Sequence, residues 1–117
     1  MSSAAVVEDD YGIMPCFTTI GSVTTSFTIS GLNSTSSVVL ISKVSTSLSI
    51  KIELQKEKSS GYETIETWTK SGTGTVLSLE ETRLINFFSN YRIKVTCKAG
   101  SETHTLYEFH YRLCKLL

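Results

Sequence analysis

The sequence has few helix-favouring residues, no excess charge of either sign and no long apolar run. Alanine occurs only at positions 4, 5 and 99, and Gln55 is the one glutamine. The 11 basic side chains are balanced by 11 acidic ones, which excludes a general nucleic-acid binder because such proteins carry a basic surface. The apolar run Val38–Ile41 is far too short to span a bilayer, which takes ~20 residues. With 40% hydrophobic residues the chain is too apolar to be disordered, so we expect one soluble globular domain.

The sequence has three cysteines, Cys16, Cys97 and Cys114, and no C-x-x-C pair. An odd number leaves at least one thiol unpaired within a monomer. A Cys16–Cys97 bridge, a Cys97–Cys114 bridge and buried free thiols all remain open. No zinc-finger spacing of cysteine and histidine is present, so the cysteines predict no metal site.

The one proline, Pro15, ends a segment that differs from the rest of the chain. Residues 1–15 begin with small residues and an acidic patch, and they lack the basic start and apolar stretch of a signal peptide. This composition resembles what remains after a leader has been removed. We therefore expect a flexible N-terminal arm over residues 1–15 and a single β-sandwich domain over residues 16–117. We also expect a secreted or cell-surface protein whose leader is absent from this sequence.

Serine and threonine are abundant, at 34 of the 117 residues, and they alternate with apolar side chains. Leu48, Ile50, Ile52 and Leu54 alternate with polar residues, and residues 91–98 repeat this pattern. A period of two is typical of a half-buried strand, whereas a helix would scatter these side chains around its circumference. The same reasoning predicts further strands at residues 23–29, 37–43, 62–70, 76–79 and 103–113. Seven strands at roughly ten-residue intervals predict an all-β, two-sheet antiparallel sandwich.

Three of these segments carry finer predictions. The spacing of three between Tyr62, Ile65 and Trp68 requires a β-bulge if they lie on one strand. Residues 80–90 indicate one helical turn or a packed crossover. In the last strand, the odd-numbered side chains from Thr103 to Leu113 are expected to face inward.

Two segments resemble a known family. Residues 90–102, NYRIKVTCKAGSE, resemble the sixth strand and following turn of fibronectin type III domains, in which a tyrosine begins an alternating strand. Residues 50–68, with Leu54-Gln55-Lys56 followed by a turn and Trp68, are similar to the central hairpin of the same domains. The resemblance implies a fibronectin type III or immunoglobulin-like sandwich. The whole arrangement also resembles small exported β-sandwich proteins of Gram-positive bacteria with no assigned function.

Patterns that carry catalysis or bind metals are scarce. His104 and His110 are six residues apart, roughly 20 Å on an extended strand, so they cannot share a metal ion. Glu108 and His110, with Glu102, would make only a weak surface site, and solvated polar residues are the ordinary explanation. No serine lies in a G-x-S-x-G elbow, and no Cys–His signature is present. We therefore expect no enzymatic activity, no catalytic residue and no cofactor.

The sequence favours a binding or structural role. Its leading interpretation is an exported interaction module that contacts a protein or cell-surface partner, with self-association as the favoured form. Nucleic acid and membrane insertion are not expected. The alternative is a carbohydrate-binding module in which Trp68, Tyr62 and Tyr11 form an aromatic platform. Against this alternative, a lone tryptophan in a small β domain more often fills the core.

Overall fold

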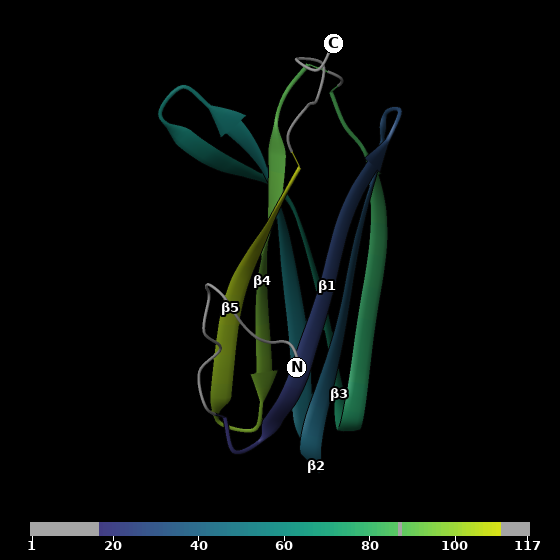
Figure 1. Cartoon of the computed structure of the whole chain (residues 1–117), viewed down its shortest axis with the longest axis vertical. Helices are drawn as coiled ribbons and strands as arrows, with labels where there is room; N and C mark the ends of the chain where they lie inside the picture. The colour runs from purple at the N-terminus through teal and green to yellow at the C-terminus, as the bar shows by residue number, and fades with distance from the viewer. Residues whose placement is uncertain (1–16, 87, 111–117) are drawn as a thin grey trace.

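The computed structural model describes residues 17–86 and 88–110, which form one five-stranded antiparallel sheet (Figure 1). The all-β prediction is therefore confirmed. The predicted N-terminal arm lies outside the described residues, as do Tyr11, Cys16 and Cys114. Within the described ranges, no helix is long and apolar enough to cross a membrane. The strands are β1 (Ile20–Ser30), β2 (Asn33–Lys58), β3 (Gly61–Leu84), β4 (Tyr91–Ala99) and β5 (Glu102–His110).

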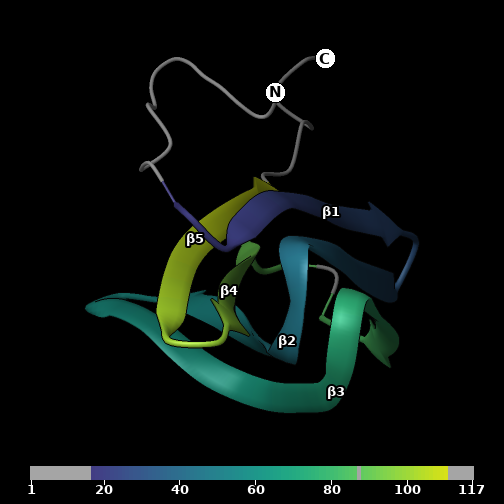
Figure 2. The ribbon, with the colours of Figure 1, turned by 90° about the horizontal axis from the view of Figure 1, so that it is seen from below.

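The sheet curls at the middle of its two long strands, β2 and β3. The two halves of β2 have different neighbours on one edge, β1 and then β4, while β3 follows β2 along the other edge. Residues 33–41 of β2 lie between β1 and residues 76–84 of β3. Further along, residues 46–58 of β2 lie between residues 61–74 of β3 and β4, and β5 pairs with the other edge of β4. The sheet thus forms an open half-barrel in which β1 comes to lie beside β5 (Figure 2).

The predicted division into seven strands and two sheets is wrong, because two expected strand ends are bends within continuous strands. Four residues of β2, 42–45, lie opposite Thr75 alone, between the pairs Ile41–Val76 and Thr46–Gly74. On β3 the bend contains Gly74, whose φ of 142° is one that residues with a side chain rarely adopt. The chain therefore changes direction at residues 42–45 and 74–75 without leaving the sheet.

The core lies on the concave side of the sheet and follows the alternation seen in the sequence. Leu48, Ile50, Ile52 and Leu54 of β2 are at most 2% exposed. A fully buried side chain of this size contributes about 1.5–3 kcal/mol relative to an exposed one. The bulge predicted near Ile65 is confirmed: Leu54 pairs with Glu66 and Gln55 with Thr64, which leaves the residue between them without a partner on β2. From β4 and the other half of the sheet, the same core receives Val38, Leu40, Tyr91, Ile93, Val95 and Cys97.

The predicted orientation of the last strand is wrong. Val95 pairs with Leu106, and Leu106 packs against the core, so the even-numbered residues of β5 face inward. Tyr107 and Phe109 are instead 42% and 43% exposed. Because side chains alternate along a strand, a shift of one residue exchanges the two faces. The even row is hard to recognise in the sequence because it contains two glutamates and two histidines. Its two carboxylates accept hydrogen bonds from β1 and from the residues just before it.

These inward polar groups hold β5 to β1 along what we call the β1–β5 side. The Glu102 carboxylate accepts hydrogen bonds from the backbone N–H groups of Thr18, Thr19 and Ile20, each at 2.9 Å, and from the Thr18 hydroxyl. Further along, the Thr25 hydroxyl donates to Glu108 Oε2 at 2.8 Å. Side chains, and not a ladder of backbone bonds, therefore join these two strands.

The opposite side of the half-barrel, which we call the β3 side, is built differently. Among the described residues β3 pairs with β2 alone, so its second edge is free along the strand. Two side-chain contacts connect the part of β3 before its bend to the part after it. Arg83 Nε lies 3.0 Å from Glu66 Oε1, and the Lys70 ammonium donates to the carbonyl oxygen of Ser78 at 2.9 Å.

Candidate functional site

The outer surface of β2 and β4 carries a cluster of positively charged side chains. Alternation turns Arg92, Lys94 and Lys98 outward from β4, because the residues between them are buried. The register aligns this row with Lys51 and Glu53 of β2. The carboxylate of Glu53 is 3.9 Å from the Lys51 ammonium. We call these five residues the cationic face, in which four positive side chains surround one negative side chain.

Three aromatic rings lie beside one end of the cationic face, around Arg92. The Arg92 guanidinium carbon lies 3.9 Å from the ring centre of Tyr62, 4.5 Å from that of Tyr107 and 5.7 Å from that of Phe109. The guanidinium Nε also donates to Gln55 Oε1 at 2.6 Å, and the Gln55 amide nitrogen donates to the Thr64 hydroxyl. Attraction between a cation and aromatic rings adds to these bonds. Arg92 is therefore held in one position by residues from three other strands, β2, β3 and β5.

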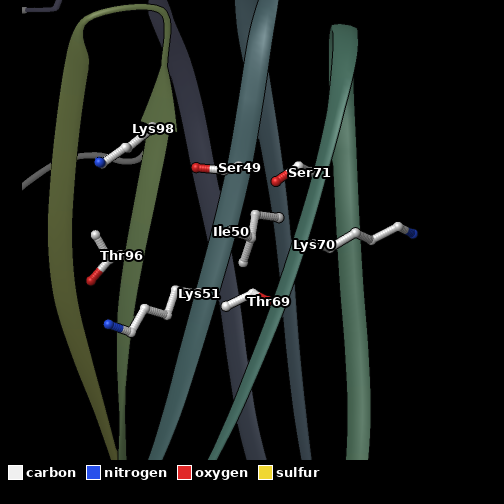
Figure 3. A pocket seen from close by; sticks show the side chains of 8 residues that line it. All are labelled: Ser49, Ile50, Lys51, Thr69, Lys70, Ser71, Thr96 and Lys98. Atoms are coloured by element: carbon white, nitrogen blue, oxygen red, sulfur yellow. The ribbon is translucent and has the colours of Figure 1, made fainter.

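Beside this row lies an open depression of about 310 Å³ (Figure 3). In the close-up, Lys51, Thr96 and Lys98 extend over the same part of the surface, whereas Lys70 points the opposite way. The depression is therefore lined by two ammonium groups and by the hydroxyl-bearing residues that lie in register with them. Its full lining is Ser49, Ile50, Lys51, Thr69, Lys70, Ser71, Thr96 and Lys98.

Catalytic and metal-binding chemistry finds little support among the described residues. They contain no group of three or more His, Cys, Asp or Glu side chains that could hold a metal ion. His104 lies against Phe17, with ring centres 5.4 Å apart, and burial lowers its pKa. Cys97 is a free, buried thiol whose pKa burial raises to about 12, so at neutral pH it is not the thiolate that a nucleophile requires.

The structure separates the residues of the predicted sugar platform. Trp68 is partly buried, pairs with Ile52 and packs against the core. Tyr62 lies on the outer surface against Arg92. Tyr11 is outside the described residues. Trp68 and Tyr62 are therefore not brought together on one surface.

Sequence reasoning missed the aromatic end of the face. The alternation of Arg92, Lys94 and Lys98 was visible and correctly placed them on one side of a strand. The alternation in residues 103–113 predicts instead that Tyr107 and Phe109 face the core, which is one residue out of phase with the structure. Recognising the Glu102 and Glu108 row as a hydrogen-bonding row would have corrected this.

Comparison with known proteins concerns the fold alone. No family model matches the chain, and no curated protein matches it in sequence. Among solved structures, the solution structure of R. palustris CsgH covers 74% of this chain and 89% of its own, with a TM-score of 0.51 and 15% identity. The chain is similar in fold to CsgH. The E. coli curli protein CsgC covers 73% of this chain and 94% of its own, with a TM-score of 0.44 and 19% identity.

The likeness in fold to CsgH and the single curled sheet correct the resemblance, drawn from the sequence, to fibronectin type III or immunoglobulin-like sandwiches and to exported β-sandwiches of Gram-positive bacteria. The alternating strands that suggested those families are real. They are arranged in one curled sheet, because β2 and β3 continue through the bends at which a two-sheet sandwich would begin new strands.

Proposed function

We propose that this protein is an exported, non-catalytic module that binds an acidic protein partner through the cationic face. The observation that carries the proposal is the fixed position of Arg92 among Tyr62, Tyr107 and Phe109, at the end of a row of lysines. Export remains a prediction from the sequence.

The composition of the cationic face and of the aromatic rings beside it supports protein binding. Arginine, tyrosine and phenylalanine are enriched in the centres of protein interfaces. Here they lie on an open sheet surface, which suits a broad partner better than a small enclosed ligand. The four cations facing one carboxylate favour a partner of negative charge, because complementary potentials guide association and select the partner.

Fixing Arg92 in advance also favours binding. A long side chain loses rotamer freedom when it is immobilised in an interface, and this loss opposes association. The aromatic rings and Gln55 already restrict Arg92 in the free protein. Arginine can then present its remaining N–H groups to a carboxylate with little further ordering.

The proposal is tested by titrating the protein with poly-L-glutamate and, in parallel, with dextran as an uncharged sugar polymer. We expect poly-L-glutamate to bind, and its affinity to fall as salt is added, because salt screens exposed charges. Lys94→Glu/Lys98→Glu should abolish binding. Lys56→Glu/Lys58→Glu, which changes the net charge equally on the β2–β3 hairpin, should leave most of it.

Equal loss in both double variants would show that net charge alone is responsible and would overturn the proposal. Arg92→Lys separates charge from position, since it keeps the positive charge but loses the planar group that stacks on the rings. We expect weaker binding from this variant. Binding of dextran would instead favour the carbohydrate alternative.

A further inference from the structure

The free edge of β3 has little of the protection that edge strands usually carry. Isolated proteins commonly block such an edge with charged side chains or proline, because its unpaired backbone groups can bind another strand. Residues 67–79 contain no proline, and Lys70 is their one charged side chain. Thr67, Thr69 and Ser71 along this stretch are exposed. Within residues 17–86 and 88–110 no strand pairs with this edge, so it can accept a further strand over this part of the chain.

Trp68 lies midway between two side chains of opposite charge on the same strand. Glu66, Trp68 and Lys70 are two residues apart and lie on one face, because their partners on β2 are the buried side chains Leu54, Ile52 and Ile50. A negative and a positive side chain therefore stand at equal distances on either side of the tryptophan.

We propose that a second copy of this chain pairs with β3, antiparallel and edge to edge, about a two-fold axis at Trp68. In an antiparallel pair with this axis, a residue n positions before Trp68 lies opposite the residue n positions after Trp68 in the other copy. Glu66 of each copy then lies opposite Lys70 of the other, and the two Trp68 side chains meet at the axis. Opposite charges and aromatic pairs are both favourable when they lie directly across two strands.

The charges on β3 favour a two-fold axis at Trp68 over axes at the two neighbouring positions on the same face. An axis at Glu66 would place that carboxylate opposite its own copy, and an axis at Lys70 would do the same with two ammonium groups. The axis at Trp68 avoids both repulsions. On the other face of the strand it places Thr67 opposite Thr69 of the second copy, which brings together small uncharged side chains.

The contacts already present on the β3 side allow this arrangement. Arg83 Nε contacts Oε1 of Glu66, and the carboxylate has a second oxygen that can accept from Lys70 of the other copy. Lys70 uses one of its three N–H groups on the carbonyl of Ser78. Because the interface is two-fold and uses the same edge of both copies, it closes after two chains and does not propagate.

Sedimentation velocity over a series of protein concentrations tests the proposal directly. We expect a monomer–dimer equilibrium in the wild-type protein. Thr67→Lys/Thr69→Lys should abolish the dimer, because each new lysine lies opposite one on the other copy. These positions are exposed, so the fold should tolerate them. The control is Thr103→Lys/Thr105→Lys on exposed positions of β5, which should leave the dimer intact.

A charge exchange tests the register. Glu66→Lys and Lys70→Glu should each prevent dimer formation alone, since each creates like charges across the axis. Mixing the two variants should restore a dimer, because every opposing pair then has opposite charges. A monomer at every wild-type concentration, a dimer that survives Thr67→Lys/Thr69→Lys, or a mixture that stays monomeric would each overturn the proposal. All of these measurements use the protein alone, so none of their outcomes depends on an acidic partner.

Discussion

The two sides of this half-barrel treat their strand edges in different ways. On the β1–β5 side, the carboxylates of Glu102 and Glu108 reach from β5 to β1 and accept hydrogen bonds from it. On the β3 side, Glu66 and Lys70 reach only to other residues of the same strand. The first side is therefore joined within the molecule, whereas the second keeps its backbone edge available.

This difference shows that a curled sheet need not close to protect an edge. A backbone ladder requires two strands to run side by side at about 4.8 Å along their length. A carboxylate requires only a few donors within its reach. Glu102 accepts four hydrogen bonds, three of them from backbone N–H groups at and just before the start of β1.

The largest effect is expected from breaking the β3 side at its bend. At Gly74 a new Cβ would meet no other atom within 4 Å, but φ is +142° there, so Gly74→Ala is strained by backbone conformation alone. We expect the free energy of unfolding to fall by about 1–3 kcal/mol. Urea denaturation measures this change. The neighbouring Thr73→Ala is the control, and equal stability of the two variants would contradict the role given to Gly74.

A smaller effect is expected from weakening the β1–β5 side. Hydrogen bonds from the Thr18 hydroxyl and from three backbone N–H groups lower the pKa of Glu102 to about 2, from an ordinary value of 4.5. The ionised carboxylate therefore stabilises the fold fully above pH 4.5, and this contribution is lost as the pH falls from 4.5 toward 2. Glu102→Gln should remove that part of the acid dependence of the melting temperature.

The same variant should speed amide hydrogen exchange at residues 18–20, because the charged acceptor of their N–H groups is gone. Glu80→Gln on β3 removes the same charge and is the control. Unchanged exchange in Glu102→Gln would show that the β1–β5 side is held by packing and not by this carboxylate.

The smallest effect is expected at the ion pair of the β3 side. Arg83 and Glu66 are each more than a third exposed, and such pairs contribute at most about 1 kcal/mol. Arg83→Gln should lower the free energy of unfolding by no more than this, and added salt should reduce the difference. A double-mutant cycle with Glu66→Gln isolates the pair. A coupling well above 1 kcal/mol would show that the β3 side is more strongly joined than its geometry indicates.

The sequence predicts those strands and bulges that depend only on residues close together in the chain. The alternation from Leu48 to Leu54 identified the central part of β2, and the spacing around Ile65 identified a bulge. In neither case does recognition require knowledge of distant residues. The row of Arg92, Lys94 and Lys98 was recognised as one face of a strand for the same reason.

The errors lie where distant residues decide the structure. Whether β2 ends near Lys43 or bends depends on the segment just before β1, since the Lys43 N–H donates to the Thr19 carbonyl and the Lys43 ammonium to the Phe17 carbonyl. The orientation of β5 depends on Glu102 meeting Thr18, 84 residues away in the sequence. The rings around Arg92 come from β3 and β5, so the candidate site could not be assembled before that orientation was known.

The continuous course of β2 through both parts of the sheet also has a consequence for the kinetics of folding. Strands β1 and β2, β2 and β3, and β4 and β5 are neighbours in the chain and can form as hairpins, which takes microseconds. The β2–β4 pairing, from Leu48–Ala99 to Lys56–Tyr91, must instead enclose the whole of β3 in a loop. Closing that loop costs chain entropy before its contacts form. We therefore expect docking of the β4–β5 hairpin onto an already formed β2–β3 hairpin to set the folding rate.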